Sequence, residues 1–207
     1  MSKDLILNRK NIPDTVNSPS AAILQQGQKN MFIQHADKIN INVTPGPIPT
    51  ILPYQPVNPS EKYYNLIVSN EINLDTTEAS FSIEPKRALT EHIDDEIKKQ
   101  FSALSEDAIR ELQTFPTIFA HENSDYGFAA PDQQAGIGYI TKIKVRHAGI
   151  IIKSSIKFKF YQQLLNENLI NFDIDGHERF SELNRTHWTV KKVNLFEELR
   201  ELGFQIS

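Results

Sequence analysis

Cysteine is absent from the 207 residues, tryptophan occurs once and methionine twice. Without cysteine the chain can form no disulfide and offers no thiolate as a nucleophile or as a zinc ligand. A zinc site would have to be assembled from the six histidines and from carboxylates, and their spacing matches no metal motif. We therefore expect no metal and no cofactor, and the lack of cysteine favours a reducing compartment such as the cytoplasm.

Long apolar runs are also missing. A membrane-spanning helix needs about 20 predominantly apolar residues, and a secretory signal needs an apolar run of at least about seven. The first ten residues offer only the short run Leu5 to Leu7. Glycine-rich phosphate-binding loops and a nucleophile elbow are absent as well. We expect a soluble protein that does not bind a membrane, and the sequence favours a protein without catalytic activity over an enzyme.

Proline is concentrated near the N-terminus, where residues 1–60 hold eight of the eleven prolines. Proline fixes φ and removes a backbone donor, so this stretch is predicted to be an extended arm. Within it, residues 38–43 alternate between polar and apolar, which predicts a strand with one buried face. Such a strand pairs with a distant sheet, pairs with another chain or stays disordered. We expect the arm to recruit a protein partner or a second copy of the chain.

Residues 61–207 have the patterning of a compact α+β domain. Six Lys/Arg stand against fifteen Asp/Glu between residues 61 and 134, whereas residues 135–207 carry eleven against eight. Short strands are predicted over residues 63–68, 79–83, 117–120 and 170–174. Helices are predicted to begin after N-caps at Thr90, Ser105 and Asn194. The domain is expected to centre on an antiparallel, strongly curved or barrel-like sheet with several short helices.

The strongest periodicity is the alternation of apolar and polar residues over 137–146 and again over 150–160, which predicts a long β-hairpin. A two-residue turn at Ala148-Gly149 would place Val145 opposite Ile152. In that register the apolar residues of both strands share one face of the hairpin.

The other face of this hairpin carries the first candidate site, a set of six cations. Like charges side by side repel, so they are tolerated only in water or against an anion. The face is therefore a candidate surface for nucleic acid, a nucleotide or an acidic protein. Alternatively it is simply solvated, or it is covered by the acidic segment 61–134. The six residues are Lys142, Lys144, Arg146, Lys153, Lys157 and Lys159.

The second candidate is His121-Glu122, where a predicted strand enters a loop. A histidine and a carboxylate can act together as acid and base, with His187 as a third, distant candidate. Neighbouring residues on a strand point to opposite faces, however, and no second histidine follows at the spacing of a zinc protease. A structural role in the loop is the alternative.

The third candidate is the polar cluster Asn184, Arg185, His187 and Trp188, which contains the only tryptophan. An amide, a planar cation, an imidazole and a stacking surface are the groups that line many binding sites for polar small molecules. Trp188 is equally suited to filling a core, and Arg185 to pairing with the acidic segment.

Several segments together resemble a group of poorly characterised bacterial proteins and domains, some of which are found among phage-defence or abortive-infection genes. The resemblance covers about residues 85–207 and part of the arm, where residues 25–38 look like a leader found before unrelated bacterial effector domains. It implies a bacterial, intracellular origin and a defence or regulatory setting, and no catalytic residue carries over from it. The matching segments are Arg87–Glu91, Phe115–Asn123, Leu183–Trp188 and Val193–Phe196.

Three hypotheses about function follow from the sequence. The first is a non-enzymatic binding, adaptor or regulatory module that recruits a protein partner or senses a ligand, in bacterial antiphage defence. The second is a nuclease or nucleotide hydrolase that combines the basic hairpin with His121, Glu122 and His187. The third is a phage-side inhibitor of a defence protein, which the sequence does not separate from the first.

Overall fold

The computed structural model describes residues 56–177 and 180–206. Their strands form a six-stranded sheet in the order β2-β5-β4-β3-β1-β8 and a small two-stranded sheet, β6-β7. The strands are β1 (Tyr64–Val68), β2 (Glu78–Ile83), β3 (Pro116–Ala120), β4 (Gln134–Arg146), β5 (Gly149–Tyr161), β6 (Gly176–His177), β7 (Phe180–Ser181) and β8 (His187–Lys191). The helices are α1 (Asp95–Phe101), α2 (Glu106–Leu112), α3 (Gln163–Glu167) and α4 (Leu195–Glu201), with 3-10 turns at η1 (Pro85–Arg87) and η2 (Glu182–Asn184). The predicted strand over 38–43 and the predicted arm before residue 56 lie outside the described residues.

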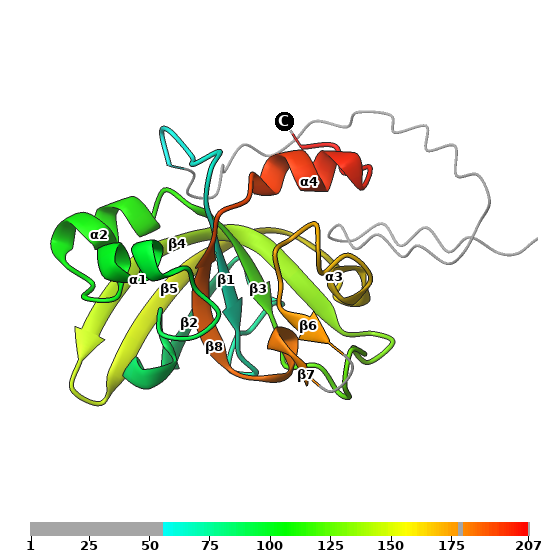
Figure 1. Ribbon diagram of the computed structural model, residues 1–207, viewed down its shortest axis with the longest axis horizontal. Coiled ribbons are helices and arrows are strands. Elements are labelled where there is room, and N and C mark those ends of the chain that lie inside the picture. The colour runs from blue at the N-terminus through cyan, green and yellow to red at the C-terminus, as the bar shows by residue number, and fades with distance from the viewer. Residues whose placement is uncertain (1–55, 178–179, 207) are drawn as a thin grey trace, which may run out of the picture. The chain divides into compact units, whose positions relative to one another are not determined.

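The predicted α+β class and strongly curved sheet are confirmed, but the sheet is mixed rather than purely antiparallel (Figure 1). β1 pairs with β3 in parallel, with Val68 aligned with Ala120, and β8 lies antiparallel on the other side of β1. Between β1 and β3 the chain forms β2, α1 and α2 before it returns, and parallel pairing requires such a long crossover. Alternation in a sequence identifies strands but not their relative direction, which explains the error.

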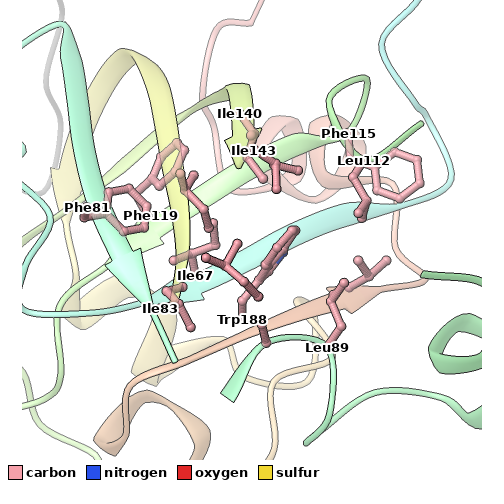
Figure 2. Close-up of a cluster of buried hydrophobic side chains, with 14 of the residues drawn as sticks. Ile67, Phe81, Ile83, Leu89, Leu112, Phe115, Phe119, Ile140, Ile143 and Trp188 are labelled. Carbon is pink, nitrogen blue, oxygen red and sulfur yellow. The ribbon is translucent and has the colours of Figure 1, made fainter. Parts of the chain in front are cut away.

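Helices cover both faces of the sheet. On one face Ile67, Phe119 and Trp188 pack with Phe101 of α1 and Leu112 of α2. Figure 2 shows Trp188 at the centre of this cluster, and the side chain is fully buried. The other face packs against α3 and α4 through Leu66, Val68, Ile118, Leu165, Leu195 and Leu199. Because β1 and β3 are covered on both sides, every residue of these two strands is buried.

The long hairpin of β4 and β5 is confirmed, but its predicted register is wrong. The turn residues are His147-Ala148, so Val145 pairs with Ile150 and not with Ile152. Two bulges follow, with Thr141 as the extra residue on β4 and Lys157 as the extra residue on β5. A bulge moves the following side chains to the other face and bends the strand.

The bulges also explain why the apolar residues of the hairpin do not share one face. Ile140 and Ile143 lie in the core under α1 and α2, whereas Ile137 and Phe160 lie in the core under α3 and α4. Val145, near the tip, is 53% exposed. The hairpin therefore contributes side chains to both cores, and its two bulges bend the sheet.

Two of the three predicted helix starts are confirmed. The hydroxyl of Ser105 accepts a hydrogen bond from the Ala108 N–H, and the side chain of Asn194 accepts one from the Glu197 N–H. The predicted start after Thr90 is wrong, because His92 has a positive φ of 53° and α1 begins only after Asp94. The predicted strand over 170–174 forms turns instead. Within the described residues, no helix is long and apolar enough to cross a membrane.

Candidate functional site

The candidate site is a pocket of about 480 Å³ at the edge of the sheet where the parallel strands β1 and β3 end. Parallel neighbours present their carboxyl ends to the same edge, so the segments that follow them meet there. One wall is the segment 70–75 after β1, a second is His121-Glu122 after β3, and the third is the start of β4. The lining residues are Asn70, Ile72, Asn73, Leu74, Asp75, His121, Glu122, Ala130, Asp132, Gln133 and Gln134.

The lining is polar and carries negative charge. Four carboxamides and the carboxylates of Asp75, Glu122 and Asp132 line the pocket, together with one imidazole. Among the described residues, lysine and arginine are absent from the lining, and the Lys159 ammonium lies 3.1 Å from the Asp75 carboxylate. The pocket therefore offers many hydrogen-bond acceptors and donors, in an environment that favours a neutral or cationic ligand.

His121 is held rigidly at this edge. Its Nε2 lies 2.8 Å from the carbonyl oxygen of Ile72, which can only accept, so Nε2 carries the hydrogen. The Gln162 carboxamide brackets the main chain of His121, accepting from its N–H at 2.9 Å and donating to its carbonyl at 2.7 Å. With the hydrogen placed on Nε2, Nδ1 of the neutral ring is a fixed acceptor.

Glu122 is turned towards a different partner. One of its carboxylate oxygens accepts hydrogen bonds from both the backbone N–H, at 2.8 Å, and the hydroxyl of Thr186. Its backbone N–H donates to the Asn70 side chain at 2.9 Å. His121 and Glu122 are both in the pocket wall, but the partners of their functional groups lie on different segments. This is the divergence expected for consecutive residues at a strand end.

Two of the candidate acid–base groups in the pocket have structural hydrogen-bond partners. Among the described residues, the ionisable side chains of the lining are His121, Asp75, Glu122 and Asp132. The one imidazole uses Nε2 to bind a carbonyl, and the Glu122 carboxylate is occupied by Thr186. His187, the third candidate acid–base group, is buried on β8 and is not part of this wall.

Several residues that build the site have no clear signal in the sequence. Gln162 is fully buried although glutamine is usually exposed, and its partner His121 lies 41 positions away. Gln133 donates to the Glu122 carbonyl at 2.9 Å and so fixes the third wall. The sequence offers only the adjacent pairs Gln133-Gln134 and Gln162-Gln163 at the two ends of the hairpin, which do not indicate a pocket.

The predicted polar cluster does not form one surface. Trp188 is fully buried and donates its indole N–H to Asn65 at 3.0 Å, and His187 is 1% exposed. Arg185 is half-exposed and pairs with Glu91 at 3.3 Å, while the Asn184 amide donates to the Asp125 carbonyl at 2.9 Å. His187 and Trp188 are neighbours on β8 and point to opposite faces of the sheet, whereas Asn184 and Arg185 precede the strand.

His187 belongs to a buried ionic cluster. The two carboxylate oxygens of Glu182 lie 2.9 Å from His187 Nε2 and 2.9 Å from Lys191 Nζ, and all three side chains are less than 5% exposed. His187 Nδ1 faces the carbonyl oxygen of Arg185 at 2.8 Å, so both ring nitrogens face acceptors. Burial alone would raise the pKa of Glu182, but the hydrogen bond from His187 and the charge of Lys191 outweigh it and lower that pKa.

This cluster also contains the one group of potential metal ligands found among the described residues. His92, Asp175 and Glu182 bring ligand atoms to within 4.8 Å of one another. However, Glu182 already accepts from His187, from the Lys191 ammonium and from the backbone N–H of Asp175, the last at 2.8 Å. A divalent ion would have to displace the Lys191 ammonium from its carboxylate. We therefore interpret the cluster as a structural ion network.

The six cations of the hairpin are divided by the bulges. Lys142 and Lys153 lie directly opposite each other, and with Lys144 and Arg146 they form an exposed group near the tip. Lys157 lies over the ring of Tyr139, with Nζ 6.0 Å from its centroid. On β5, Lys159 is flanked by Phe158 and Phe160, which both pack in the core under α3 and α4. Lys159 therefore points to the opposite face of the sheet, where it pairs with Asp75. Four of the six cations remain together as a candidate surface for an anion.

Comparisons of the chain with protein-family models, with curated proteins and with solved structures found no match. The site is accordingly interpreted from its own geometry.

Proposed function

We propose that this chain is a non-enzymatic binding module whose polar pocket senses a small polar ligand. The observation that carries the proposal is the pocket at the carboxyl ends of β1 and β3, which is lined by carboxamides and carboxylates and in which Nε2 of His121 and the Glu122 carboxylate are held in structural hydrogen bonds. Its volume of about 480 Å³ lies in the range of small-molecule sites.

The rigidity of the walls supports binding. Gln162 and Gln133 hold the segment of His121 from two sides, and Asn70 holds it from a third through the Glu122 N–H. A site whose donors and acceptors are fixed in advance loses less conformational entropy when a ligand binds.

The separation of the candidate catalytic groups favours binding over the hydrolase hypothesis. That hypothesis needs His121, Glu122 and His187 to act on one substrate. In the described structure their functional groups face Ile72, Thr186 and Glu182 respectively. A general base must reach the proton it abstracts, directly or through one water.

The proposal keeps the predicted arm as the element that passes the signal on. Residues 1–60 would recruit a protein partner or a second copy of the chain, and the resemblance to bacterial defence proteins gives the setting. Both parts rest on the sequence, and a phage-side inhibitor would use the same binding chemistry.

Ligand-observed NMR on the full chain would test the pocket, using a panel of amino acids, amines, sugars and nucleosides at about 1 mM, the upper range of useful affinities. At least one compound is expected to bind. Replacing Asp132 by Asn or Gln134 by Ala, which removes a lining group without disturbing the clamps on His121, is expected to weaken that binding by about tenfold. Glu201→Gln, a charge change on α4, is the matched control and should leave it unchanged.

Two outcomes would overturn the proposal. One is that none of the compounds binds, or that Asp132→Asn and Gln134→Ala bind as the parent does. The other is that a bound compound is chemically converted and that His121→Gln abolishes the conversion, which would favour the hydrolase hypothesis.

A further inference from the structure

A second pocket, of about 350 Å³, lies over the bulge where Lys157 is the extra residue of β5. The sheet forms its floor through Ile137, Tyr139 and Phe158, and α4 with the segment after it forms a wall. Figure 1 shows α4 lying across the sheet. The lining residues are Pro59, Glu61, Ile137, Tyr139, Lys157, Phe158, Phe196, Arg200, Gln205 and Ile206. None of these residues lines the polar pocket.

The wall is positioned by the end of α4. Gly203 has a φ of 88°, a left-handed conformation that favours glycine, and its N–H bonds to the Arg200 carbonyl at 2.9 Å. The turn sends Phe204 back onto the sheet, where its ring centroid lies 6.0 Å from that of Phe158 and 5.8 Å from that of Phe160. Residues 205 and 206 are thereby brought to the edge of the pocket.

The pocket combines aromatic and aliphatic walls with two cations. Phe158, Phe196 and Ile206 supply apolar surface, and Lys157 and Arg200 supply positive charge. Among the described residues, Glu61 is the single carboxylate in the lining. Burial lowers the pKa of Lys157, which means that its charged form is penalised there. A ligand carboxylate beside the ammonium would favour its charged form.

Tyr139 adds a directed donor. The residue is 3% exposed and lines the pocket, and its hydroxyl makes no hydrogen bond to any of the described residues. Burial raises the pKa of Tyr139 to about 12, so the hydroxyl keeps its proton at neutral pH. The protonated hydroxyl can donate a hydrogen bond to a ligand acceptor in the pocket.

We propose that this second pocket binds an amphipathic carboxylate, with its aromatic or branched aliphatic body against Phe158 and Phe196 and its carboxylate between Lys157, Arg200 and the Tyr139 hydroxyl. The charge of the lining, two cations against one carboxylate, selects an anion. The apolar walls select a ligand with a hydrophobic body over a free inorganic ion. This site and the polar pocket thus favour ligands of opposite charge.

The test uses the full chain and 2-naphthoate, with the neutral 2-naphthamide as the matched probe, and follows binding by isothermal titration calorimetry. A ligand of this size is expected to bind with a Kd of about 1 mM or tighter, and the amide about tenfold more weakly. Arg200→Met and Lys157→Met should each weaken naphthoate binding by about tenfold and Tyr139→Phe by about fivefold. Lys144→Met, a cation of the hairpin tip, should change it less than twofold, or by about 0.4 kcal/mol.

The proposal fails if naphthoate does not bind at about 5 mM, well above the expected Kd, or if the amide binds equally well. It also fails if Lys144→Met weakens binding as much as Arg200→Met does. Arg200 is exposed on α4, so its replacement tests the site even if Lys157→Met does not fold. Asp132 lines only the polar pocket, so Asp132→Asn should leave naphthoate binding unchanged if the two sites are separate.

Discussion

Gly138 offers the sharpest test of the bulged hairpin that shapes both pockets. An alanine Cβ at this position would overlap the carbonyl oxygen of Ser155 and lie 2.9 Å from its carbonyl carbon and 3.0 Å from the Cα of Ile156. All three atoms belong to the backbone of β5, so no side-chain rotation relieves the contact. The strands would have to separate at the bulge where Lys157 is inserted.

The expected cost of Gly138→Ala is at the upper end of overpacking substitutions, about 3 kcal/mol. Gly136 is the matched control on the same strand. A Cβ there would lie 3.1 Å from side-chain methyl groups of Ile156 and Leu74 and would meet no backbone atom closer than 3.8 Å. Small movements of these side chains relieve the contact, and alanine restricts the unfolded chain, so Gly136→Ala should change stability by less than about 1 kcal/mol.

Urea unfolding followed by tryptophan fluorescence would measure both variants, because the single Trp188 is fully buried and reports the loss of the core. The difference of about 2 kcal/mol corresponds to a drop in Tm of several degrees for a chain of this size. If the two alanine variants are equally stable within about 0.5 kcal/mol, the close contact at Gly138 does not exist as described and the bulge is wrongly placed.

The buried ionic cluster gives two further predictions. Lys191→Met removes the ammonium that pairs with Glu182 and should cost about 3 kcal/mol in urea unfolding. Adding Glu182→Gln to that variant should recover part of the loss, and equal stability of the single and double variants would contradict the pairing. Because the pKa of Glu182 is lowered in the folded protein, its ionised form stabilises the fold fully above the unfolded pKa of about 4.3, and that stability is lost as pH falls through the folded value. The free energy of unfolding should therefore fall more steeply below about pH 4 in the parent than in Glu182→Gln, and parallel curves would refute the assignment.

Local signals in the sequence predicted local structure well. Ser105 and Asn194 cap helices because a cap involves residues only three positions apart. The alternation over residues 137–160 predicted the hairpin for the same reason. The predicted register failed first at the turn, which is formed by His147-Ala148 and not by Ala148-Gly149. It shifts again at the bulges of Thr141 and Lys157, because a bulge adds one residue and leaves no mark in the alternation that precedes it.

The candidate site was predicted only in part. His121 and Glu122 were identified from their place at a strand end, and both line the polar pocket. The opposing wall, residues 70–75, lies about fifty positions away and adjoins them because β1 and β3 pair in parallel. His187 and Trp188 had the chemistry of a binding surface, but β8 pairs with β1 at the edge of the sheet and both side chains are buried.

By itself the sequence determined the composition of the protein, its α+β class, its long hairpin and two helix starts, because these depend on contacts between near neighbours in the chain. The tertiary structure decided the direction of strand pairing, the two bulges, the burial of the Glu182 cluster and the two pockets. Each of these depends on which distant segments meet, and the free energy of that meeting comes from packing many residues at once. This packing free energy cannot be predicted from the pattern of neighbouring residues in the sequence.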